Sequence, residues 1–228
     1  QPLGAPAAQA IRDAWVRHGL VVFRNQDIDD AAHMRLSEVF GEMEPSAVSY
    51  INDPSNTYMM VLEYDPATAK KNAQNYNVGG IDRASWLGWH WDQSFMPTIV
   101  RGAVLRMTHP SECMGETGLI DAIAAYDRLD DAMKRRIDSL EVVYQYNPDF
   151  GSGQFGFPGD IRPLPLPDGM TPGGWNLDFP PVVHPLAITQ METGRKVLKL
   201  SPMHSRYVLG MERAESHALL TELAEHLC

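Results

Sequence analysis

The chain contains one segment that is dense in aromatic and metal-ligating side chains: Trp86-Leu87-Gly88-Trp89-His90-Trp91-Asp92-Gln93-Ser94-Phe95. Side chains alternate between the two faces of a strand, so an extended segment would point His90 and Asp92 to the same side. An imidazole and a carboxylate so placed supply two of the three ligands of a 2-His-1-carboxylate iron site. The alternative is a histidine and an aspartate that share only a hydrogen bond, because His-x-Asp is a short pattern that often arises by chance.

Short apolar runs on both sides of this segment predict strands. They cover residues 20–23, 58–63, 102–107 and 142–144, and then 182–189 and 195–200, which form a hairpin with Gly194 in its turn. These runs are joined by loops and hairpins and do not alternate regularly with helices, which favours an antiparallel sandwich or barrel over a doubly wound sheet. The predicted fold class is therefore mainly β with flanking helices.

Helices are predicted where apolar residues recur three and four positions apart. The sets are Ala8, Ile11 and Trp15; Leu36, Val39, Phe40 and Met43; Met133, Ile137 and Leu140; and Leu220, Leu223, Ala224 and Leu227. Acidic residues precede all but the first set, as expected at the positive end of a helix dipole. The first helix is expected to end at Gly19, and residues 20–23 are expected to form a buried strand.

Residues 147–181 differ sharply in composition from the rest of the chain. They hold seven glycines and eight prolines, which exclude a regular helix or a central strand. Loops of this length without secondary structure are uncommon in compact domains and tend to be lids, binding loops or linkers. Phe155, Phe157, Trp175 and Phe179 offer apolar anchors. A Gly/Pro-rich lid is therefore favoured over a free linker.

Charge and composition disfavour several classes of protein. The 228 residues carry 19 basic and 29 acidic side chains, a net charge of −10, without a block of Lys and Arg that would bind a phosphate backbone. A hydrophobic share of 44% supports a sizeable core. No apolar run approaches the ~20 residues that span a bilayer. Cys113 and Cys228 are the only cysteines, which is typical of a cytoplasmic protein. From the charge pattern and the short apolar runs we expect that it binds neither nucleic acid nor membrane.

Further motifs stand in order around the His-x-Asp segment. They are the run 19–24, the Gly115-Glu116-Thr117-Gly118 turn with the helix after it, the His184-Pro185 strand and the Thr193-Gly194-Arg195 hairpin. In order and spacing the chain resembles the TauD/TfdA family of iron(II)- and 2-oxoglutarate-dependent dioxygenases over nearly its whole length. The resemblance implies a double-stranded β-helix, the jelly-roll form of a sandwich, in a single domain over residues 1–228.

The family motifs also imply roles for individual residues. By position, His90 and Asp92 correspond to the first two iron ligands, and Thr117 to the hydroxyl that helps hold 2-oxoglutarate. From the residues alone, Thr117 could equally be a turn residue bonded to its own backbone. The family's distal histidine ligand and 2-oxoglutarate-binding arginine are expected beyond Cys228, and its opening strand before Gln1. The implied cofactor and cosubstrate are Fe(II) and 2-oxoglutarate.

The resemblance implies that the substrate is a small organic acid, hydroxylated with O2 with or without ensuing cleavage. His204 falls where aryloxyalkanoate-type members carry a histidine near the substrate. Trp86 stands where taurine dioxygenase has a sulfonate-binding asparagine, which disfavours taurine. Arg206 is a further candidate, because a guanidinium can bind a carboxylate through two parallel hydrogen bonds. We expect an aromatic or aryloxyalkanoate-like acid, and a homo-oligomeric enzyme.

Two alternatives accompany this interpretation. Trp86, Trp89, Trp91 and Phe95 could line an aromatic substrate pocket, or they could be plain core residues beside a strand. The protein itself could be a catalytically silent jelly roll that binds a small acid, since the iron ligand set is incomplete within these residues. A zinc hydrolase is less attractive, because zinc sites prefer more His or Cys than this region offers.

Overall fold

The computed structural model describes residues 3–48, 52–62, 75–83, 86–111, 115–147, 153–157, 159–165 and 179–228. The helices in these ranges are α1 (Ala5–His18), α2 (Asp30–Ser37), α4 (Ala122–Arg128), α5 (Asp131–Ile137) and α6 (Arg213–Leu227). The strands are β1 (Asn52–Asp53), β2 (Asn56–Met60), β3 (Tyr76–Val78), β4 (Ile81–Arg83), β5 (Glu141–Tyr144), β6 (Arg162–Pro163), β7 (Val182–Pro185), β8 (Ala187–Thr189), β9 (Lys196–Leu198) and β10 (Ser205–Val208).

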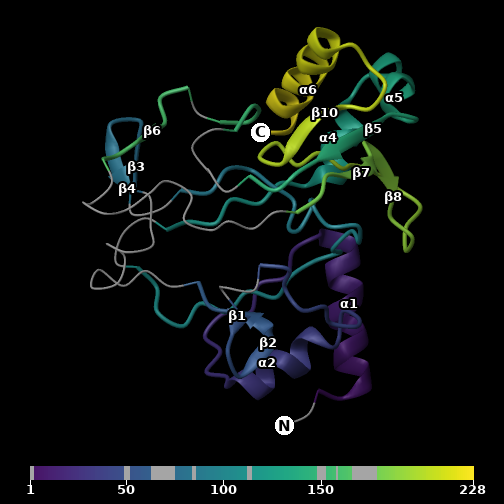
Figure 1. The fold of residues 1–228 in the computed structure, drawn as a ribbon. Helices are drawn as coiled ribbons and strands as arrows, with labels where there is room; N and C mark the ends of the chain where they lie inside the picture. Colours follow the sequence, from purple (N-terminus) through teal and green to yellow (C-terminus); the bar gives the residue numbers. More distant parts are fainter. Residues whose placement is uncertain are drawn as a thin grey trace.

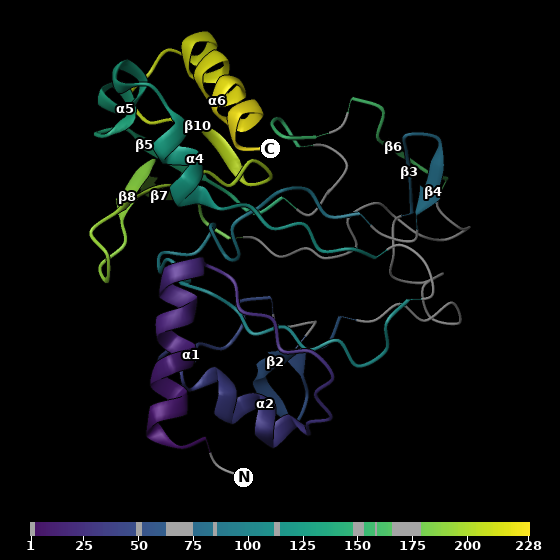
Figure 2. The ribbon, with the colours of Figure 1, turned by 180° about the vertical axis from the view of Figure 1, so that it is seen from behind.

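The described strands form four small antiparallel sheets. Figures 1 and 2 show α4, α5 and α6 with β5, β7, β8 and β10 at one end of the molecule, and α1, α2 and the β1–β2 pair at the other. The β3–β4–β6 sheet lies to one side, and extended segments connect the parts. This arrangement is rich in short strands and has helices on its outside.

The main hydrophobic core lies at the α4–α6 end. A sheet of order β10-β5-β7 is covered by α6, and α4 packs against β9. Tyr144, Leu186, Leu198 and Leu220 are fully buried in the cluster that joins these elements. The run 182–189 divides at Leu186 into β7, which pairs with β5, and β8, which pairs with β9. One predicted strand thus serves two sheets, as strands do at the corners of sandwiches.

Acidic side chains cap the N-termini of the helices, as the sequence indicates. Asp130 accepts a hydrogen bond from the amide of Met133 at 2.7 Å, and Asp121 accepts from two amides of α4 at 2.9 Å. Glu212 caps α6 in the same way. Each carboxylate satisfies amides that have no partner inside the helix. The predicted starts of α5 and α6 are therefore confirmed.

The Thr193-Gly194-Arg195 hairpin is fastened to α4 and α5. Gly194 has a φ of 70°, the left-handed conformation that this turn requires of a residue without Cβ. Arg195 pairs with Asp127 of α4. Asp138, which follows α5, accepts from Lys196 Nζ at 3.1 Å and from the Tyr126 hydroxyl at 2.9 Å. This motif therefore joins β9 to two helices of the core.

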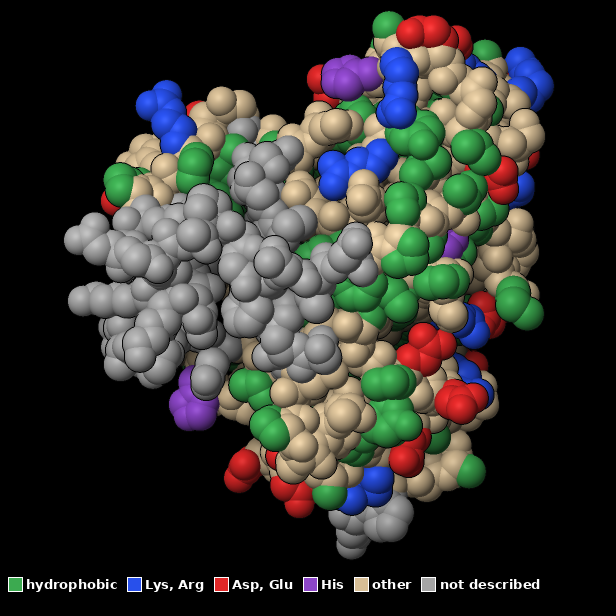
Figure 3. Space-filling model, viewed as in Figure 1, with side chains coloured by type: hydrophobic (Ala, Val, Ile, Leu, Met, Phe, Trp, Pro, Cys, Tyr) green, Lys and Arg blue, Asp and Glu red, His purple; other side chains and the backbone are tan. Residues whose placement is uncertain are grey.

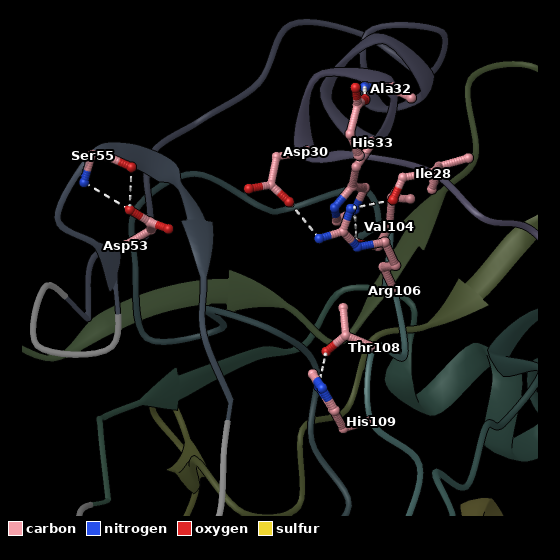
Figure 4. Close-up of polar contacts among 11 residues, drawn as sticks. Ile28, Asp30, Ala32, His33, Asp53, Ser55, Val104, Arg106, Thr108 and His109 are labelled. Atoms are coloured by element: carbon pink, nitrogen blue, oxygen red, sulfur yellow. Dashed lines mark hydrogen bonds and ion pairs between the residues drawn. The ribbon is translucent and has the colours of Figure 1, made fainter.

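At the other end, polar contacts hold α2 against the extended segment 101–107. Figure 4 shows the Arg106 guanidinium reaching the Ile28 carbonyl, at 2.9 Å, and the Asp30 carboxylate. The His33 ring lies 2.9 Å from the Val104 carbonyl in the same view. On α1, the Trp15 ring lies so close to Gly102 that a Cβ there would come within 2.9 Å of it.

Two predicted strands are wrong. Residues 20–23 and 102–107 have no strand assignment, and Leu20, Val22 and Phe23 are 49%, 58% and 43% exposed. An apolar run becomes a strand only when a neighbouring strand accepts and donates its backbone hydrogen bonds, and no described segment pairs with either run. The sequence shows that a run is apolar, but it does not show whether another strand lies beside it to pair with.

Two predicted boundaries also shift. The helix predicted through Met43 ends at Ser37, because Val39 and Phe40 bond three residues back in turns and Gly41 takes a φ of 146°. The strand predicted for 58–63 is β2, Asn56–Met60, paired with β1. Residue 63 lies outside the described residues.

Parts of the predicted lid, 147–181, are described. Phe155 is buried in the main core, and the Phe157 ring centroid lies 5.1 Å from that of Trp86. Phe179 packs 4.9 Å from Phe95, measured between ring centroids. Trp175 lies outside the described residues. These three aromatic anchors attach the loop to the body of the protein.

The surface is mixed in character. Figure 3 shows acidic and basic side chains interspersed with apolar ones over the described part of this face. Among the described residues, no helix is long and apolar enough to cross a membrane.

Candidate active site

The segment that carries His90 and Asp92 is not a strand: residues 86–91 are irregular with a bend at Trp89, and turns begin at Asp92. Gln93 adopts a φ of 50°, and the amides of Ser94 and Met96 bond back to Trp91 and Gln93 at 3.2 and 2.8 Å. The two candidate ligands nevertheless face each other, with His90 Nε2 at 3.1 Å from Asp92 Oδ1. The segment is thus not a strand, and the two side chains lie on the same side, as the hypothesis required.

The second ring nitrogen of His90 defines the chemistry of this pair. Nδ1 lies 2.8 Å from the Gly88 carbonyl, which can only accept, so Nδ1 carries the proton. In a neutral ring, Nε2 then presents a lone pair to the Asp92 carboxylate, and two acceptors face each other. Only a shared cation, either a proton or a metal ion, makes this contact favourable. A histidine held through Nδ1 is also the usual form of a metal-ligating imidazole.

The pKa shifts of the pair agree with a shared cation. Burial by itself lowers the pKa of His90, but the hydrogen bonds to Asp92 and Gly88 outweigh it and raise the pKa above its ordinary value. The hydrogen bond from His90 lowers the pKa of Asp92, against the opposing effect of burial. The side chains are 24% and 54% exposed, so the pair is open to an ion from solvent.

His204 is brought next to this pair from a distant part of the chain. Its ring centroid lies 6.2 Å from that of His90, and the residue is 4% exposed. Burial, with further effects of His90 and Arg206, lowers the pKa of His204 to about 3, so its ring is neutral. Its Nδ1 is buried and has no hydrogen-bond partner among the described residues. A buried polar atom of this kind is costly unless something binds it.

An aromatic cluster surrounds His204. Phe95 lies 5.1 Å from the His204 ring and 4.9 Å from both Tyr146 and Phe179, while Tyr146 stacks on His204 at 6.0 Å. The sequence offered Phe95 as a pocket or core residue and Phe179 as an anchor of the loop, but it did not single out Tyr146. The spacing of Tyr144, the last residue of β5, and Tyr146 was the available signal, because a continued strand would place both rings on one face.

The three tryptophans of the segment have different surroundings. Trp86 packs on Phe157, and the Trp91 ring donates to the Val100 carbonyl at 2.8 Å and lies against Lys199. The Trp89 ring contacts the Gly115–Gly118 turn so closely that a Cβ at Gly118 would lie 2.4 Å from it. The turn that contains Thr117 therefore lies beside the ligand segment, and Thr117 itself is exposed.

Arg206 completes the group. It is half-buried, and its Nη2 donates to the Tyr146 carbonyl at the long distance of 3.4 Å. Its Nε has no hydrogen-bond partner within the part of the chain that the structure describes. Burial lowers its pKa, although a guanidinium remains charged. With His204, it offers unused hydrogen-bond donors beside the aromatic cluster.

The histidine and the carboxylate form a pair and not a closed metal site. Within the described ranges, no group of three or more His, Cys, Asp or Glu side chains is placed to hold a metal ion. Two protein ligands, on their own, leave most of the positions around an octahedral ion for other donors.

Comparison with known proteins places this arrangement in context. The model of the family "Taurine catabolism dioxygenase TauD, TfdA family" matches residues 1–228. The (S)-phenoxypropionate/alpha-ketoglutarate-dioxygenase of Sphingobium herbicidovorans is 27% identical over 96% of this chain and 69% of its own length. The alpha-ketoglutarate-dependent 2,4-dichlorophenoxyacetate dioxygenase of Cupriavidus pinatubonensis is 27% identical over 99% of this chain and 75% of its own.

A solved structure shows the same fold. The crystal structure of AAD-2 in complex with Mn(II) and N-oxalylglycine matches with a TM-score of 0.60 and 24% identity, over 100% of this chain and 71% of that one. The predicted jelly-roll class is confirmed by this likeness, which concerns the fold alone. From the family match over the whole chain, the protein belongs to the TauD/TfdA family of dioxygenases, oxidoreductases that depend on Fe(II) and 2-oxoglutarate.

Proposed function

We propose that this dioxygenase hydroxylates a small aromatic carboxylic acid of the aryloxyalkanoate kind. The observation that carries the proposal is the His90–Asp92 pair, with its 3.1 Å contact, beside an aromatic cluster that contains unused hydrogen-bond donors. The relatives named above act on phenoxypropionate and on 2,4-dichlorophenoxyacetate. An acid with an aromatic ring suits both the cluster and these relatives.

In this proposal His90 Nε2 and Asp92 Oδ1 are two of the ligands of Fe(II). The donor set fits, because a neutral imidazole and a carboxylate suit ferrous iron and the pair already requires a cation between its facing acceptors. Thr117 is proposed to help hold 2-oxoglutarate, supported by the packing of its turn against Trp89. Bound Fe(II), with 2-oxoglutarate and O2, supplies the oxidising chemistry of hydroxylation.

The protein's own part is to bind and orient the acid. Arg206 would bind the carboxylate, with His204 Nδ1 donating a second hydrogen bond if its proton is on that nitrogen. Phe95, Tyr146 and Phe179 would contact the ring of the substrate, because their mutual distances of 4.9–5.5 Å form a continuous apolar wall. Trp86 is proposed as an outer contact, next to Phe157.

Loop 147–181 is proposed as a lid over this site. Its Phe179 belongs to the aromatic cluster, so a movement of this part of the loop would open or close the wall. Closure would exclude water and hold the acid against the ligand pair.

The test compares the ligand variants with a matched histidine control. His90→Ala and Asp92→Ala should each abolish succinate formation from 2-oxoglutarate and weaken anaerobic Mn(II) binding at least tenfold, because each removes a ligand. His18→Ala, at the exposed end of α1, should change neither. Circular dichroism should show that all three variants fold. Succinate formation at the normal rate in either ligand variant would contradict the assignment.

The same assay separates the enzyme from a silent binding protein. An enzyme couples consumption of 2-oxoglutarate to the presence of an aryloxypropionate, whereas a binding module binds the acid without succinate formation. We further propose a cytoplasmic location, supported by the low cysteine content. A homo-oligomer stays a prediction, and light scattering on the purified protein tests it.

A further inference from the structure

The ligand segment is held from behind by one buried serine. Ser201 lies between β9 and β10, is 0% exposed, and accepts a hydrogen bond from the Trp91 amide at 3.0 Å. This amide stands between the two ligand residues, His90 and Asp92. The Ser94 hydroxyl also donates to Ser201 Oγ, at 2.9 Å. One hydroxyl group therefore contacts the segment at two points, from a position 110 residues away in the sequence.

The connector that carries Ser201 is itself firmly bonded. The Ser201 carbonyl accepts from the His204 amide, the Ser205 amide and the Ser205 hydroxyl, at 3.0, 2.9 and 2.7 Å. Two residues further along the same connector, the Met203 amide donates to the Trp89 carbonyl at 3.1 Å. The same short stretch thus holds the ligand segment at Trp89, Trp91 and Ser94.

These bonds matter because no described strand pairs with residues 86–95. In a sheet, ladder hydrogen bonds would fix the backbone between two ligands, and here residues 86–91 are irregular and turns begin at Asp92. The separation of His90 Nε2 and Asp92 Oδ1 depends on the backbone angles of residues 90–92, and the amide at position 91 is the polar group in their middle. Small errors in such geometry have large effects on metal affinity.

We propose that Ser201 is a positioning residue that fixes the backbone between His90 and Asp92 and so sets the geometry of the metal site. The alternative is that Ser201 only stabilises the buried core and has no effect on the metal site. The part that concerns metal rests on the proposed function, while the part that concerns the backbone does not.

Ser216 provides a matched control. It is 1% exposed on α6, and its hydroxyl accepts from the Val208 amide at 2.8 Å, the same kind of bond in an equally buried place. Ser201→Ala and Ser216→Ala each remove the acceptor of one backbone amide, part-buried at Trp91 and buried at Val208, so a purely structural role predicts consequences for Ser216→Ala at least as large as for Ser201→Ala. A third variant, Ser94→Ala, keeps the bond from the Trp91 amide.

Amide hydrogen exchange and Mn(II) affinity are measured on all three variants. Ser201→Ala should speed exchange at least tenfold across residues 89–95 and weaken Mn(II) binding about tenfold, within the range seen when a group that orients a ligand is lost. Ser216→Ala should speed exchange around Val208 and change Mn(II) affinity less than twofold. Ser94→Ala should fall between wild type and Ser201→Ala.

Two results would overturn the inference. One is faster exchange confined to Trp91 in Ser201→Ala, without change at its neighbours. The other is an equal loss of Mn(II) affinity in Ser201→Ala and Ser216→Ala. A wild-type protein that binds no Mn(II) would contradict the metal ligands of the proposed function instead, and the exchange comparison would still decide the role of Ser201.

Discussion

At the scale of single residues, three of the described buried groups without a hydrogen-bond partner lie around the candidate site, while others, such as His33 Nδ1, lie elsewhere. Arg206 Nε and His204 Nδ1 lie beside the aromatic cluster, and Lys199 Nζ lies behind the ligand segment. In the unfolded chain these groups form hydrogen bonds to water, so each one that is buried without a partner in the folded protein needs an explanation. For Arg206 and His204 that reason is the proposed acid.

Replacement of Arg206 tests its role as the carboxylate-binding residue. Arg206→Met keeps much of the side-chain volume but removes the charge, so the KM for an aryloxypropionate should rise about tenfold or more, while the 2-oxoglutarate KM changes little. Arg213→Met is the control, because this exposed guanidinium lies 3.7 Å over the Tyr207 ring and away from the cluster. Steady-state kinetics gives both constants. Equal effects of the two variants would contradict the role of Arg206.

Lys199 predicts an unusual dependence of stability on pH. Its Nζ lies 4.2 Å from the centre of the Tyr144 ring, and burial lowers its pKa to about 7. The unfolded chain would bind the proton up to pH ~10. Between these values the folded state binds fewer protons, so wild-type stability should rise as the pH rises from 7 to 10.

Lys199→Met removes that dependence. At pH 6–7 the variant should be more stable than wild type by about 1–4 kcal/mol, the range found when buried charges are replaced by apolar side chains, and the gain should shrink towards pH 10. Urea unfolding at several pH values measures it. Lys196→Met is the control and should give no gain, because Lys196 lies in β9, just before Lys199, and pairs with Asp138. A Lys199→Met variant that is less stable at pH 7 would show that the aromatic rings compensate for the buried charge.

At the scale of elements, the charged residues of the Thr193-Gly194-Arg195 hairpin and of β9 form contacts that stabilise the fold. Asp138 receives hydrogen bonds from β9 and α4, and Arg136 of α5 pairs with Glu215 of α6 at 3.1 Å. These contacts explain why a Thr-Gly-Arg hairpin and the helix after the Gly115–Gly118 turn occur together. The hairpin and β9 supply Arg195 and Lys196, which pair with Asp127 of α4 and with Asp138 after α5.

Asp138→Asn should lower stability in a pH-dependent way. The hydrogen bond from Lys196, followed by that from Tyr126, lowers the pKa of Asp138. A lowered carboxyl pKa contributes stability above its ordinary value near 4 that is lost as the pH falls through the folded pKa. The variant should therefore lose about 1 kcal/mol at pH 7, and its difference from wild type should shrink as the pH falls below the ordinary carboxyl pKa, measured by urea unfolding. Glu225→Gln, on the exposed side of α6, is the control and should match wild type.

At the scale of the whole molecule, the two ends are held in different ways. The α4–α6 end has an extensive buried core, whereas α1 and α2 contain no fully buried residue. Their attachment depends on the Trp15 ring, which meets Gly102 and lies 5.3 Å from Phe40, and on the polar contacts of Arg106 and His33 in Figure 4. Local stability should therefore be lower at the α1–α2 end.

Trp15→Ala should loosen this end selectively. Removal of the ring leaves a gap between α1 and residues 101–107 and should speed amide exchange in α1 and α2 by an amount equivalent to about 2 kcal/mol. Exchange in α6 should stay at the wild-type rate. Gln9→Ala, whose side chain bonds only to Asp13 within the helix, is the control. Uniform acceleration over both ends would mean that the molecule opens as one unit.

Features that depend on neighbours in sequence could be predicted from the sequence. The caps Asp130 and Glu212, the turn at Gly194 and the strands 142–144 and 182–189 rest on hydrogen bonds and alternation within a few residues. The family could also be predicted from the sequence, because its short motifs occur in a fixed order along the chain. Residue type and local spacing contain this information because backbone sterics and short-range hydrogen bonds act locally.

Features that depend on distant partners were decided by the tertiary structure. Residues 20–23 are apolar but pair with no strand in the described part of the chain, and the His90–Asp92 contact lies in an irregular segment that Ser201 holds across 110 residues. The cluster around His204 joins Phe95 to Phe179, and Lys199 is buried although lysine is ordinarily exposed. Such contacts depend on which surfaces meet when the chain packs, and residue spacing along the sequence does not specify that choice.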